Sequence, residues 1–127
     1  MAETSALPKI LIADDDPEVL KMVEAALRPV SAQLFQAADG EQALETFLVE
    51  QPELVILDIM MPRLSGWEVA KYIRERDQYA GVKLLMLSGI GEAVNDATAP
   101  VVGADDHLDK PFSFEVLANR VRDLLAK

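Results

Sequence analysis

Residues 54–68 read LVILDIMMPRLSGWE, and four apolar residues at the start of this stretch lead directly to Asp58. An uninterrupted apolar run of this length is typical of a strand buried on both faces of a parallel sheet. The loop that follows carries Pro62 and Gly66, and apolar side chains then recur at helical spacing through residues 67–77. The stretch therefore predicts a buried strand, a loop and a helix, with a carboxylate where the strand ends.

Two other charged groups come where a predicted strand ends. They are Asp14, Asp15 and Asp16 after residues 9–13, and Lys110 with Pro111 after residues 105–109. In an open parallel sheet, ligands bind outside the carboxyl ends of the strands. We therefore expect the aspartates and Lys110 to converge at one edge of the sheet.

The rest of the chain repeats this unit of strand and helix. Asp16 and Ser113 are expected to cap the first and last helices. A short, mobile helix is expected within residues 91–103, because Gly91 and Pro100 are among several residues there that weaken helix formation. The other elements are strands at residues 9–13, 34–38, 54–58, 82–87 and 106–109, and helices at residues 17–27, 41–50, 67–77 and 115–126.

The apolar residues of the predicted helices form stripes that should face the core. These residues are Val19, Leu20, Val23, Ala26 and Leu27, then Ala43, Leu44, Phe47 and Leu48, then Val69, Ala70 and Ile73, and finally Val116, Leu117, Val121, Leu124 and Leu125. Strands that alternate with helices of this length imply right-handed crossovers and a sheet with helices on both faces. The predicted fold class is α/β, with a doubly wound five-stranded parallel sheet.

Composition limits both the size and the partners of the protein. The 127 residues, 50% of them hydrophobic, fit one domain at residues 9–127 behind an N-terminal extension at residues 1–8. With 12 Lys and Arg against 22 Asp and Glu, the net charge of −10 argues against direct binding to nucleic acid or to an anionic membrane. There is no cysteine and no long apolar segment, so we expect a soluble, cytoplasmic protein.

The neighbouring carboxylates of Asp14 and Asp15 repel each other unless a proton or a cation intervenes. Magnesium resolves this conflict, because it takes one or two carboxylates with a backbone carbonyl and leaves positions for phosphate oxygens. Lys110 would neutralise a phosphoryl oxygen as a point charge, and Pro111 would fix its loop, with a cis bond as one means. The alternative is structural: Asp16 caps the helix, while Asp14 and Asp15 are merely solvated.

Together, these motifs resemble the receiver domain of two-component response regulators, typified by the bacterial chemotaxis regulator. The resemblance covers nearly the whole chain. Asp58 precedes Ser88 by 30 positions and Lys110 by 52, the separations expected of such domains. The resemblance implies a flavodoxin-like (βα)5 fold with strand order 2-1-3-4-5. The segments that carry it are ILIADDD at 10–16, LVILDIMMPRLSGWE at 54–68, MLSG at 86–89 and GADDHLDKPF at 103–112.

The resemblance also implies a role for each residue of the site. Asp58 would be the phosphoacceptor and would attack a phosphohistidine, while magnesium and Lys110 stabilise charge on the phosphoryl oxygens. Ser88 would donate its hydroxyl to the phosphoryl group, with small Gly89 leaving room, whereas the structural alternative for Ser88 is a strand-end hydrogen bond. The residues implied to bind magnesium are Asp14, Asp15, Asp58 and, through its backbone carbonyl, Met60.

Several positions depart from the pattern of the family. His107 stands where many relatives carry Tyr or Phe, so a switch there would be weaker or pH-sensitive, and a half-exposed strand residue is the alternative. Met60 and Ile90 lie two positions after the acceptor and the serine, and both would shield the acyl phosphate from water, which predicts slow dephosphorylation. Ser65 replaces a common aspartate, and Gly66 is expected to supply any left-handed conformation in that turn.

The leading hypothesis is a signalling module, not an enzyme. Phosphorylation by a sensor histidine kinase or a histidine phosphotransfer protein would switch its binding to a downstream output domain or protein. A magnesium-dependent phosphohydrolase would need a second carboxylate at Met60, and a flavin-binding module would need a phosphate loop where three aspartates stand. The remaining alternative is a receiver-like adaptor that works without phosphorylation.

The position of the last helix at the end of the chain leaves two expectations open. The chain is either a single-domain regulator that acts by protein contact or a receiver from a longer protein. Dimerisation through the last two strand–helix units would be typical of the family, although the weak predicted helix within residues 91–103 lies in that surface.

Overall fold

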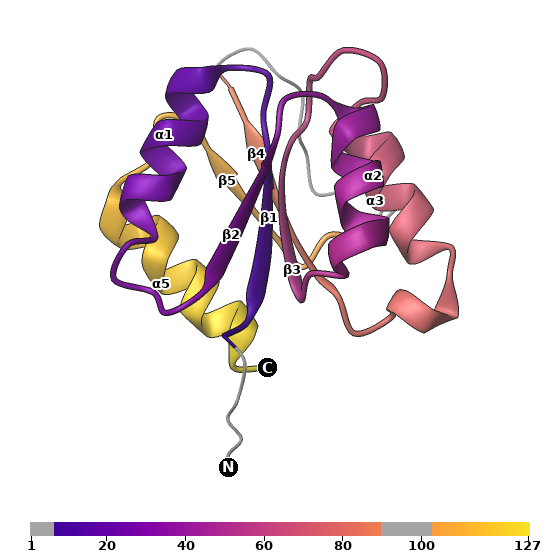
Figure 1. Ribbon diagram of the computed structural model, residues 1–127. Coiled ribbons are helices and arrows are strands. Elements are labelled where there is room, and N and C mark those ends of the chain that lie inside the picture. The colour runs from indigo at the N-terminus through magenta and orange to yellow at the C-terminus, as the bar shows by residue number, and fades with distance from the viewer. Residues whose placement is uncertain (1–6, 90–102) are drawn as a thin grey trace.

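A five-stranded parallel sheet forms the centre of the protein (Figure 1). The computed structural model describes residues 7–89 and 103–127. The strands are β1 (Lys9–Ala13), β2 (Gln33–Ala37), β3 (Leu54–Asp58), β4 (Lys83–Ser88) and β5 (Asp106–Asp109). The described helices are α1 (Pro17–Ala26), α2 (Gly40–Glu50), α3 (Gly66–Arg74), the short 3-10 helix η1 (Asp77–Tyr79) and α5 (Phe114–Leu125). The strand order β2-β1-β3-β4-β5 confirms the predicted order.

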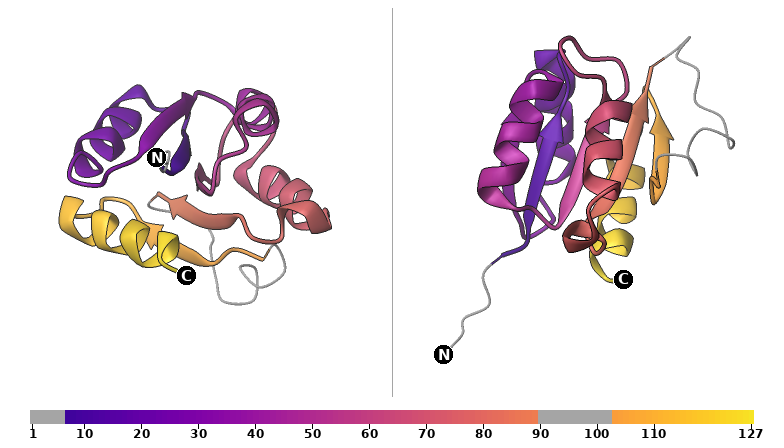
Figure 2. Two further views of the ribbon diagram at one scale, coloured as in Figure 1. Left: turned by 60° about the horizontal axis from the view of Figure 1, so that its bottom comes forward. Right: turned by 90° about the vertical axis from the view of Figure 1, so that its right-hand side faces the viewer.

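Helices cover both faces of the sheet, as Figure 2 shows. On one face, buried side chains of α2 and α3 pack against alternate strand residues such as Leu11 and Val55. On the other face, α1 and α5 pack against the intervening residues, such as Ile12 and Ile56. Successive residues of a strand point to opposite faces, so an uninterrupted apolar run fills both layers. The doubly wound α/β architecture is therefore confirmed.

Short polar side chains start these helices by accepting a hydrogen bond from an amide of the first turn. Asp16 accepts one at 2.9 Å and caps α1, and Ser113 accepts one at 3.0 Å and caps α5, as predicted. Asp39 caps α2 and Ser65 caps α3 in the same way. Three of these four helices, all but α3, begin within five residues of the preceding strand, so the loops that lead into these three helices are short.

The predicted strand bounds are close to the observed ones. The bounds of β1, β3 and β5 agree with the prediction, whereas β2 lies one residue earlier, from Gln33, whose amide donates to the carbonyl of Pro8. The fourth strand, β4, lies one residue later, because the amide of Val82 donates to Tyr79 within the preceding turn. The helix predicted within residues 91–103 falls almost entirely outside the described residues.

The third helix is shorter than predicted. The sequence pattern extends to residue 77, but α3 ends at Arg74, and η1 follows. The backbone of Arg76 is extended, with φ of −114° and ψ of 119°, so the chain leaves the helix axis there. This turn places the ring of Tyr79 edge-on against Phe47 of α2, with ring centroids 4.8 Å apart. Contact between the two rings stabilises this turn, and residues 75–77 lie beyond the last residue of α3.

Two side chains predicted to face the core are instead exposed. Leu48 is 42% exposed and Val116 is 40% exposed. Each lies one position from a buried residue, Phe47 in α2 and Leu117 in α5. One position on an α-helix is a rotation of about 100°, which turns the neighbouring side chain off the buried face. The predicted apolar stripes were therefore too wide at these two positions.

Gly40→Ala should destabilise the protein, because a Cβ atom at this buried position would collide with the backbone carbonyl of Leu64. Overpacking of a well-packed site typically costs about 1–3 kcal/mol, and we expect the free energy of unfolding to fall by about 2 kcal/mol. Urea denaturation measures the change. Gly81→Ala is the matched control, since nothing lies within 4 Å of a Cβ there. Equal stability of the two variants would contradict the close packing at the start of α2.

Candidate functional site

Charged and polar side chains meet at the carboxyl ends of the strands. Asp14 directly follows β1, Asp58 is the last residue of β3, Ser88 is the last residue of β4, and Lys110 directly follows β5. The Nζ atom of Lys110 lies 2.9 Å from Oδ2 of Asp14 and 3.0 Å from Oδ1 of Asp58. The predicted convergence of these groups at one edge of the sheet is therefore confirmed.

The two carboxylates nearest the ammonium group are buried. Asp14 is 0% and Asp58 is 2% exposed, whereas Asp15 is exposed. The amide of Asp14 donates to the carbonyl of Ala37 at 3.1 Å, and its Oδ1 accepts from the amide of Asp16 at 2.9 Å. The structural alternative predicted that Asp16 caps α1 and that Asp14 is merely solvated. Asp16 does cap α1, but the prediction for Asp14 is wrong because Asp14 is buried.

Burial and pairing act in opposite directions on these charges. Burial raises the pKa of the Asp14 carboxyl, although the Lys110 ammonium and the Asp16 amide both favour its charged form. Burial also disfavours charged Lys110, but its contacts with Asp14 and Asp58 outweigh burial and raise the pKa of Lys110. The lysine therefore stays positively charged. The negative charge of Asp14 is costly to hold there unless a further cation contributes.

Oxygen atoms of three aspartates lie close enough to share one cation. One carboxylate oxygen each from Asp14, Asp15 and Asp58 lies within 4.8 Å of the other two. The buried Oδ2 of Asp14 has no aligned hydrogen-bond donor among the described residues, and its contact with Lys110 is an ion pair. Carboxylate oxygens are the ligands that Mg²⁺ prefers. The residues of this acidic cluster therefore fit a small divalent cation.

The ends of β4 and β5 connect Ser88 with Lys110. The amide of Lys110 donates to the carbonyl of Ser88 at 2.6 Å, and the peptide bond between Lys110 and Pro111 is cis, as the sequence had allowed. Ser88 is 2% exposed, and its Oγ donates to Oδ1 of Asp109 at 2.8 Å. The Ser88 hydroxyl thus lies at the same edge of the sheet as Lys110 and makes a strand-end hydrogen bond.

The loop after Asp58 approaches its own strand closely. The amide of Gly66 donates to the carbonyl of Ile59 at 2.8 Å, and a Cβ atom on Gly66 would collide with the carbonyl of Asp58. The left-handed residue of the loop is Arg63, with φ of 73°, so the expectation that Gly66 supplies this conformation is wrong. Gly66 is required for close approach, and Ser65 starts α3 with a capping box.

Three further predicted residues lie beside these groups in the sequence. Met60 is 62% exposed. His107 is half-buried in β5, where it is paired with Met86 of β4. This burial agrees with the structural alternative for His107, and its role as a switch stays a prediction. Ile90 lies outside the described residues.

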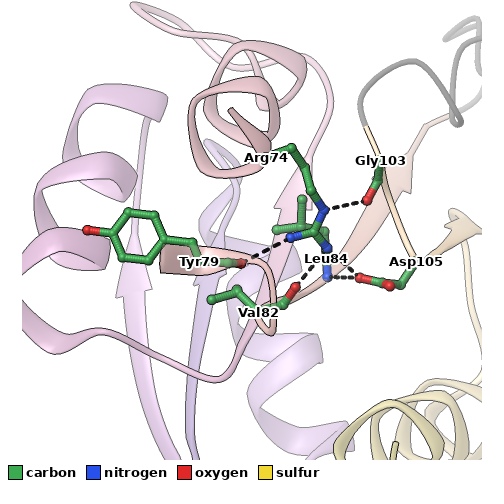
Figure 3. A network of polar contacts seen from close by, with 6 residues as sticks. All are labelled: Arg74, Tyr79, Val82, Leu84, Gly103 and Asp105. Carbon is green, nitrogen blue, oxygen red and sulfur yellow. Dashed lines mark hydrogen bonds and ion pairs between the residues drawn. The ribbon is translucent and has the colours of Figure 1, made fainter. Parts of the chain in front are cut away.

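Two polar connections were missed from the sequence, those of Asp109 and Arg74. The Arg74 guanidinium forms a network at the amino ends of β4 and β5 (Figure 3), and Oδ2 of Asp105 in this network also accepts from the amide of Leu84 at 2.7 Å. The contacts of Arg74 with Gly103 and Asp105 span 29 and 31 positions, and no local sequence pattern indicates them. For Asp109, the available signal was its position directly before Lys110. The partners of Arg74 are the carbonyls of Gly103 (2.8 Å), Val82 (2.7 Å) and Tyr79 (3.5 Å) and the carboxylate of Asp105 (2.7 Å).

Known proteins share both this sequence and this fold. Residues 10–122 match the family model of the response regulator receiver domain. The chain is 38% identical over 119 residues to the "Probable transcriptional regulator ycf27" of Cyanophora paradoxa, an alignment covering 94% of this chain and 48% of that protein. It is 36% identical over 121 residues to the DNA-binding dual master transcriptional regulator RpaA of Synechocystis sp., which covers 95% of this chain and 50% of RpaA.

Among solved structures, the chemotaxis response regulator CheY4 of Vibrio cholerae resembles the chain with a TM-score of 0.84 and 29% identity. That alignment covers 94% of this chain and 99% of CheY4. The chain spans about half the length of the curated relatives it matches, and the DNA binding named for RpaA is a property of that protein. None of the helices in the described part of the chain has the length and apolar character needed to cross a membrane.

Lys110→Met should destabilise the protein in the presence of EDTA, because it removes the ammonium group that contacts the buried carboxylates of Asp14 and Asp58. Breaking a buried ion pair costs about 3–5 kcal/mol, and we expect a loss of about 2 kcal/mol at neutral pH because the Lys110 side chain is 18% exposed. Adding Asp14→Asn should restore part of that stability, since it removes one of the two charges. Urea denaturation measures all three proteins.

Lys9→Met is the matched control for this variant. The ion pair between Lys9 and Glu50 is 3.4 Å long, and its side chains are 38% and 32% exposed. Such a solvated pair contributes less than about 1 kcal/mol. A loss of stability no larger for Lys110→Met than for Lys9→Met would contradict the electrostatic role of Lys110.

Proposed function

The chain belongs to the response regulator receiver domain family, and we propose that Asp58 is the residue on which it accepts a phosphoryl group. The donor is a phosphohistidine of a sensor histidine kinase or of a histidine phosphotransfer protein. One observation carries the proposal: a single lysine contacts two buried carboxylates at the carboxyl ends of the strands, Asp14 at 2.9 Å and Asp58 at 3.0 Å. The protein thus acts as a signalling module rather than as an enzyme that turns over a substrate.

Transfer begins when a carboxylate oxygen of Asp58 attacks the phosphorus atom of the phosphohistidine in line. The new O–P bond forms as the P–N bond breaks, and the electron pair of that bond stays on the donor's imidazole nitrogen. Asp58 becomes an acyl phosphate, whose charge is spread over three phosphoryl oxygens. Lys110 is already charged and lies 3.0 Å from Asp58, so it can stabilise the developing charge with little reorganisation.

The residues proposed to hold Mg²⁺ are Asp14, Asp15, Asp58 and, through its backbone carbonyl, Met60. The grouping of the three carboxylates and the unaligned buried Oδ2 of Asp14 support this assignment. When bound, the ion supplies positive charge against the phosphoryl oxygens and offsets their repulsion by the carboxylates. The acidic cluster can therefore receive an anionic phosphoryl group despite its own negative charge.

Four other side chains have proposed roles once the acyl phosphate has formed. Ser88 donates its hydroxyl to a phosphoryl oxygen, and Gly89 leaves room beside it. Met60 and Ile90 are both apolar and restrict the access of water, so the phosphorylated form is long-lived. His107 transmits the change along β5 to the surface of the protein, where partners bind.

Residues 9–127 are proposed as the signalling unit, with residues 1–8 as an extension. The unit works in the cytoplasm, where it meets its phosphodonor, and the phosphorylated form binds a downstream output domain or protein. Its net charge of −10 disfavours direct contact with nucleic acid. Dimerisation through the last two strand–helix units is a further proposed contact.

Incubation with Mg²⁺ and acetyl phosphate should add the mass of one phosphoryl group to the parent protein and none to Asp58→Asn. The amide of the variant is a much weaker nucleophile than a carboxylate. Intact-mass spectrometry measures the adduct, and EDTA should prevent it. Asp39→Asn is the matched control, because Asn preserves the N-cap of α2 and leaves the acidic cluster intact.

Either of two outcomes would contradict this assignment. One is an adduct on Asp58→Asn equal to that on the parent. The other is no adduct on the parent although calorimetry shows that Mg²⁺ binds, a result that would favour an adaptor working without phosphorylation. The control variant must be labelled like the parent for either comparison to count.

Met60→Asn combined with Ile90→Glu should shorten the half-life of the phosphorylated protein by about tenfold or more. Polar side chains at these positions can orient a water molecule toward the phosphoryl group, as Met and Ile cannot. The loss of the phosphoryl mass with time, after removal of acetyl phosphate, measures the half-life. Val49→Asn replaces a 78% exposed apolar residue of α2 and serves as control. An unchanged half-life in the double variant would exclude shielding by Met60 and Ile90.

A further inference from the structure

The hydrogen bond between Ser88 and Asp109 has no part in the function proposed above. Ser88 ends β4, Asp109 ends β5, and the two residues are directly paired in the register of these strands. The Oγ atom of Ser88 donates to Oδ1 of Asp109 at 2.8 Å. The residue proposed to contact the phosphoryl group is therefore already bonded to another anion.

A serine hydroxyl carries one proton and can donate a strong hydrogen bond to one acceptor at a time. A carboxylate and a phosphoryl oxygen are both charged acceptors, and both form stronger bonds than a neutral acceptor does. The Asp109 carboxylate and a phosphoryl group on Asp58 must therefore compete for the proton of Ser88. Phosphorylation can engage Ser88 only when the bond to Asp109 breaks.

We propose that Asp109 is a positioning residue that holds the Ser88 hydroxyl in the unphosphorylated protein and releases it when Asp58 is phosphorylated. This inference rests on the proposed function of Asp58. Asp109 thereby sets the balance between the resting and the phosphorylated conformations, because every engagement of Ser88 by a phosphoryl group first costs the bond to Asp109.

The different exposure of the two partners suits such an exchange. Ser88 is 2% exposed, so leaving its hydroxyl without an acceptor would destabilise the protein. Asp109 is exposed, so water can solvate its carboxylate once Ser88 has left. Ser88 can therefore pass from one anionic acceptor to another while the group that it abandons remains hydrated.

The backbone next to Asp109 joins this exchange to the charged centre of the site. Lys110 follows Asp109 directly, its amide donates to the carbonyl of Ser88 at 2.6 Å, and its Nζ lies 3.0 Å from Asp58. One dipeptide at the end of β5 thus contacts Ser88 through the Asp109 side chain and Asp58 through the Lys110 side chain. Release of Ser88 by Asp109 and contact of Lys110 with a phosphoryl group therefore occur within the same short segment.

Beryllofluoride, a non-covalent mimic of a phosphoryl group, provides the test when it is titrated with Mg²⁺ into the full chain. Asp109→Leu removes the acceptor and should tighten the binding of beryllofluoride roughly 3- to 10-fold. Asp109→Asn keeps an uncharged acceptor oxygen and should tighten it less. In the Ser88→Ala background, Asp109→Leu should change the affinity less than about twofold, because no hydroxyl remains to be held.

These titrations separate the hydrogen bond from the negative charge of Asp109. Equal tightening by Asp109→Leu in the parent and in the Ser88→Ala background would assign the effect to charge alone and overturn the inference. An unchanged affinity of Asp109→Leu for beryllofluoride, with normal binding by the parent, would also overturn the inference. That result would leave the proposed function of Asp58 intact. If the parent failed to bind beryllofluoride, the proposed function would fall and the inference with it.

A second measurement needs no phosphoryl mimic. The unfolding equilibrium constants of Asp109→Leu, Ser88→Ala and the combined variant form a double-mutant cycle in the presence of EDTA. A hydrogen bond between the two side chains predicts that their effects are coupled by a factor of about three or more. A coupling factor near one would show that Asp109 does not hold Ser88 in the resting protein, whatever the titrations showed.

Discussion

The placement of one ammonium group between two buried carboxylates is the interaction on which the functional site depends. Lys110 contacts Asp14 after β1 and Asp58 at the end of β3, and two buried carboxylates at one edge of a sheet repel each other without a cation. Lys110 itself follows the edge strand β5, so its position depends on the pairing of β5 with β4. Hydrogen bonds stabilise that pairing at both ends. At the amino end of β5, Arg74 contacts Gly103 and the carboxylate that precedes the strand. At the carboxyl end, the amide of Lys110 donates to the last carbonyl of β4.

The same charges explain how an acidic site can receive an anionic group. The cluster holds three carboxylates, those of Asp14, Asp15 and Asp58, and one ammonium contacts two of them, so negative charge remains for a divalent cation to neutralise. The contacts that raise the pKa of Lys110 keep it protonated and ready for the phosphoryl oxygens. In the proposed function, burial of Asp58 restricts the access of water to the acyl phosphate, and exposed Met60 lies beside Asp58 in the sequence. The proposed acceptance of the phosphoryl group and its proposed persistence therefore depend on the same edge of the sheet.

Much of this site follows from local sequence, and the rest depends on packing between distant segments. Apolar runs ending at Asp58 and before Asp14 predict buried strands, and the carboxyl ends of parallel strands necessarily share an edge, which is why the convergence could be predicted. The early end of α3 could not be predicted, because it depends on contact between rings of η1 and α2. The bond from Ser88 to Asp109 spans 21 positions and requires both the register of β4 with β5 and one orientation of the serine side chain.

The most direct test of the central claim is to locate the phosphoryl group chemically. The protein would be incubated with Mg²⁺ and acetyl phosphate, reduced with borohydride, which converts an aspartyl phosphate to homoserine, and then mapped by peptide mass spectrometry. The proposed chemistry predicts homoserine at position 58 alone, and only when both Mg²⁺ and acetyl phosphate are present. Homoserine at another aspartate, or none at position 58 in protein that binds Mg²⁺, would show that Lys110 and the two buried carboxylates do not form a phosphoacceptor site.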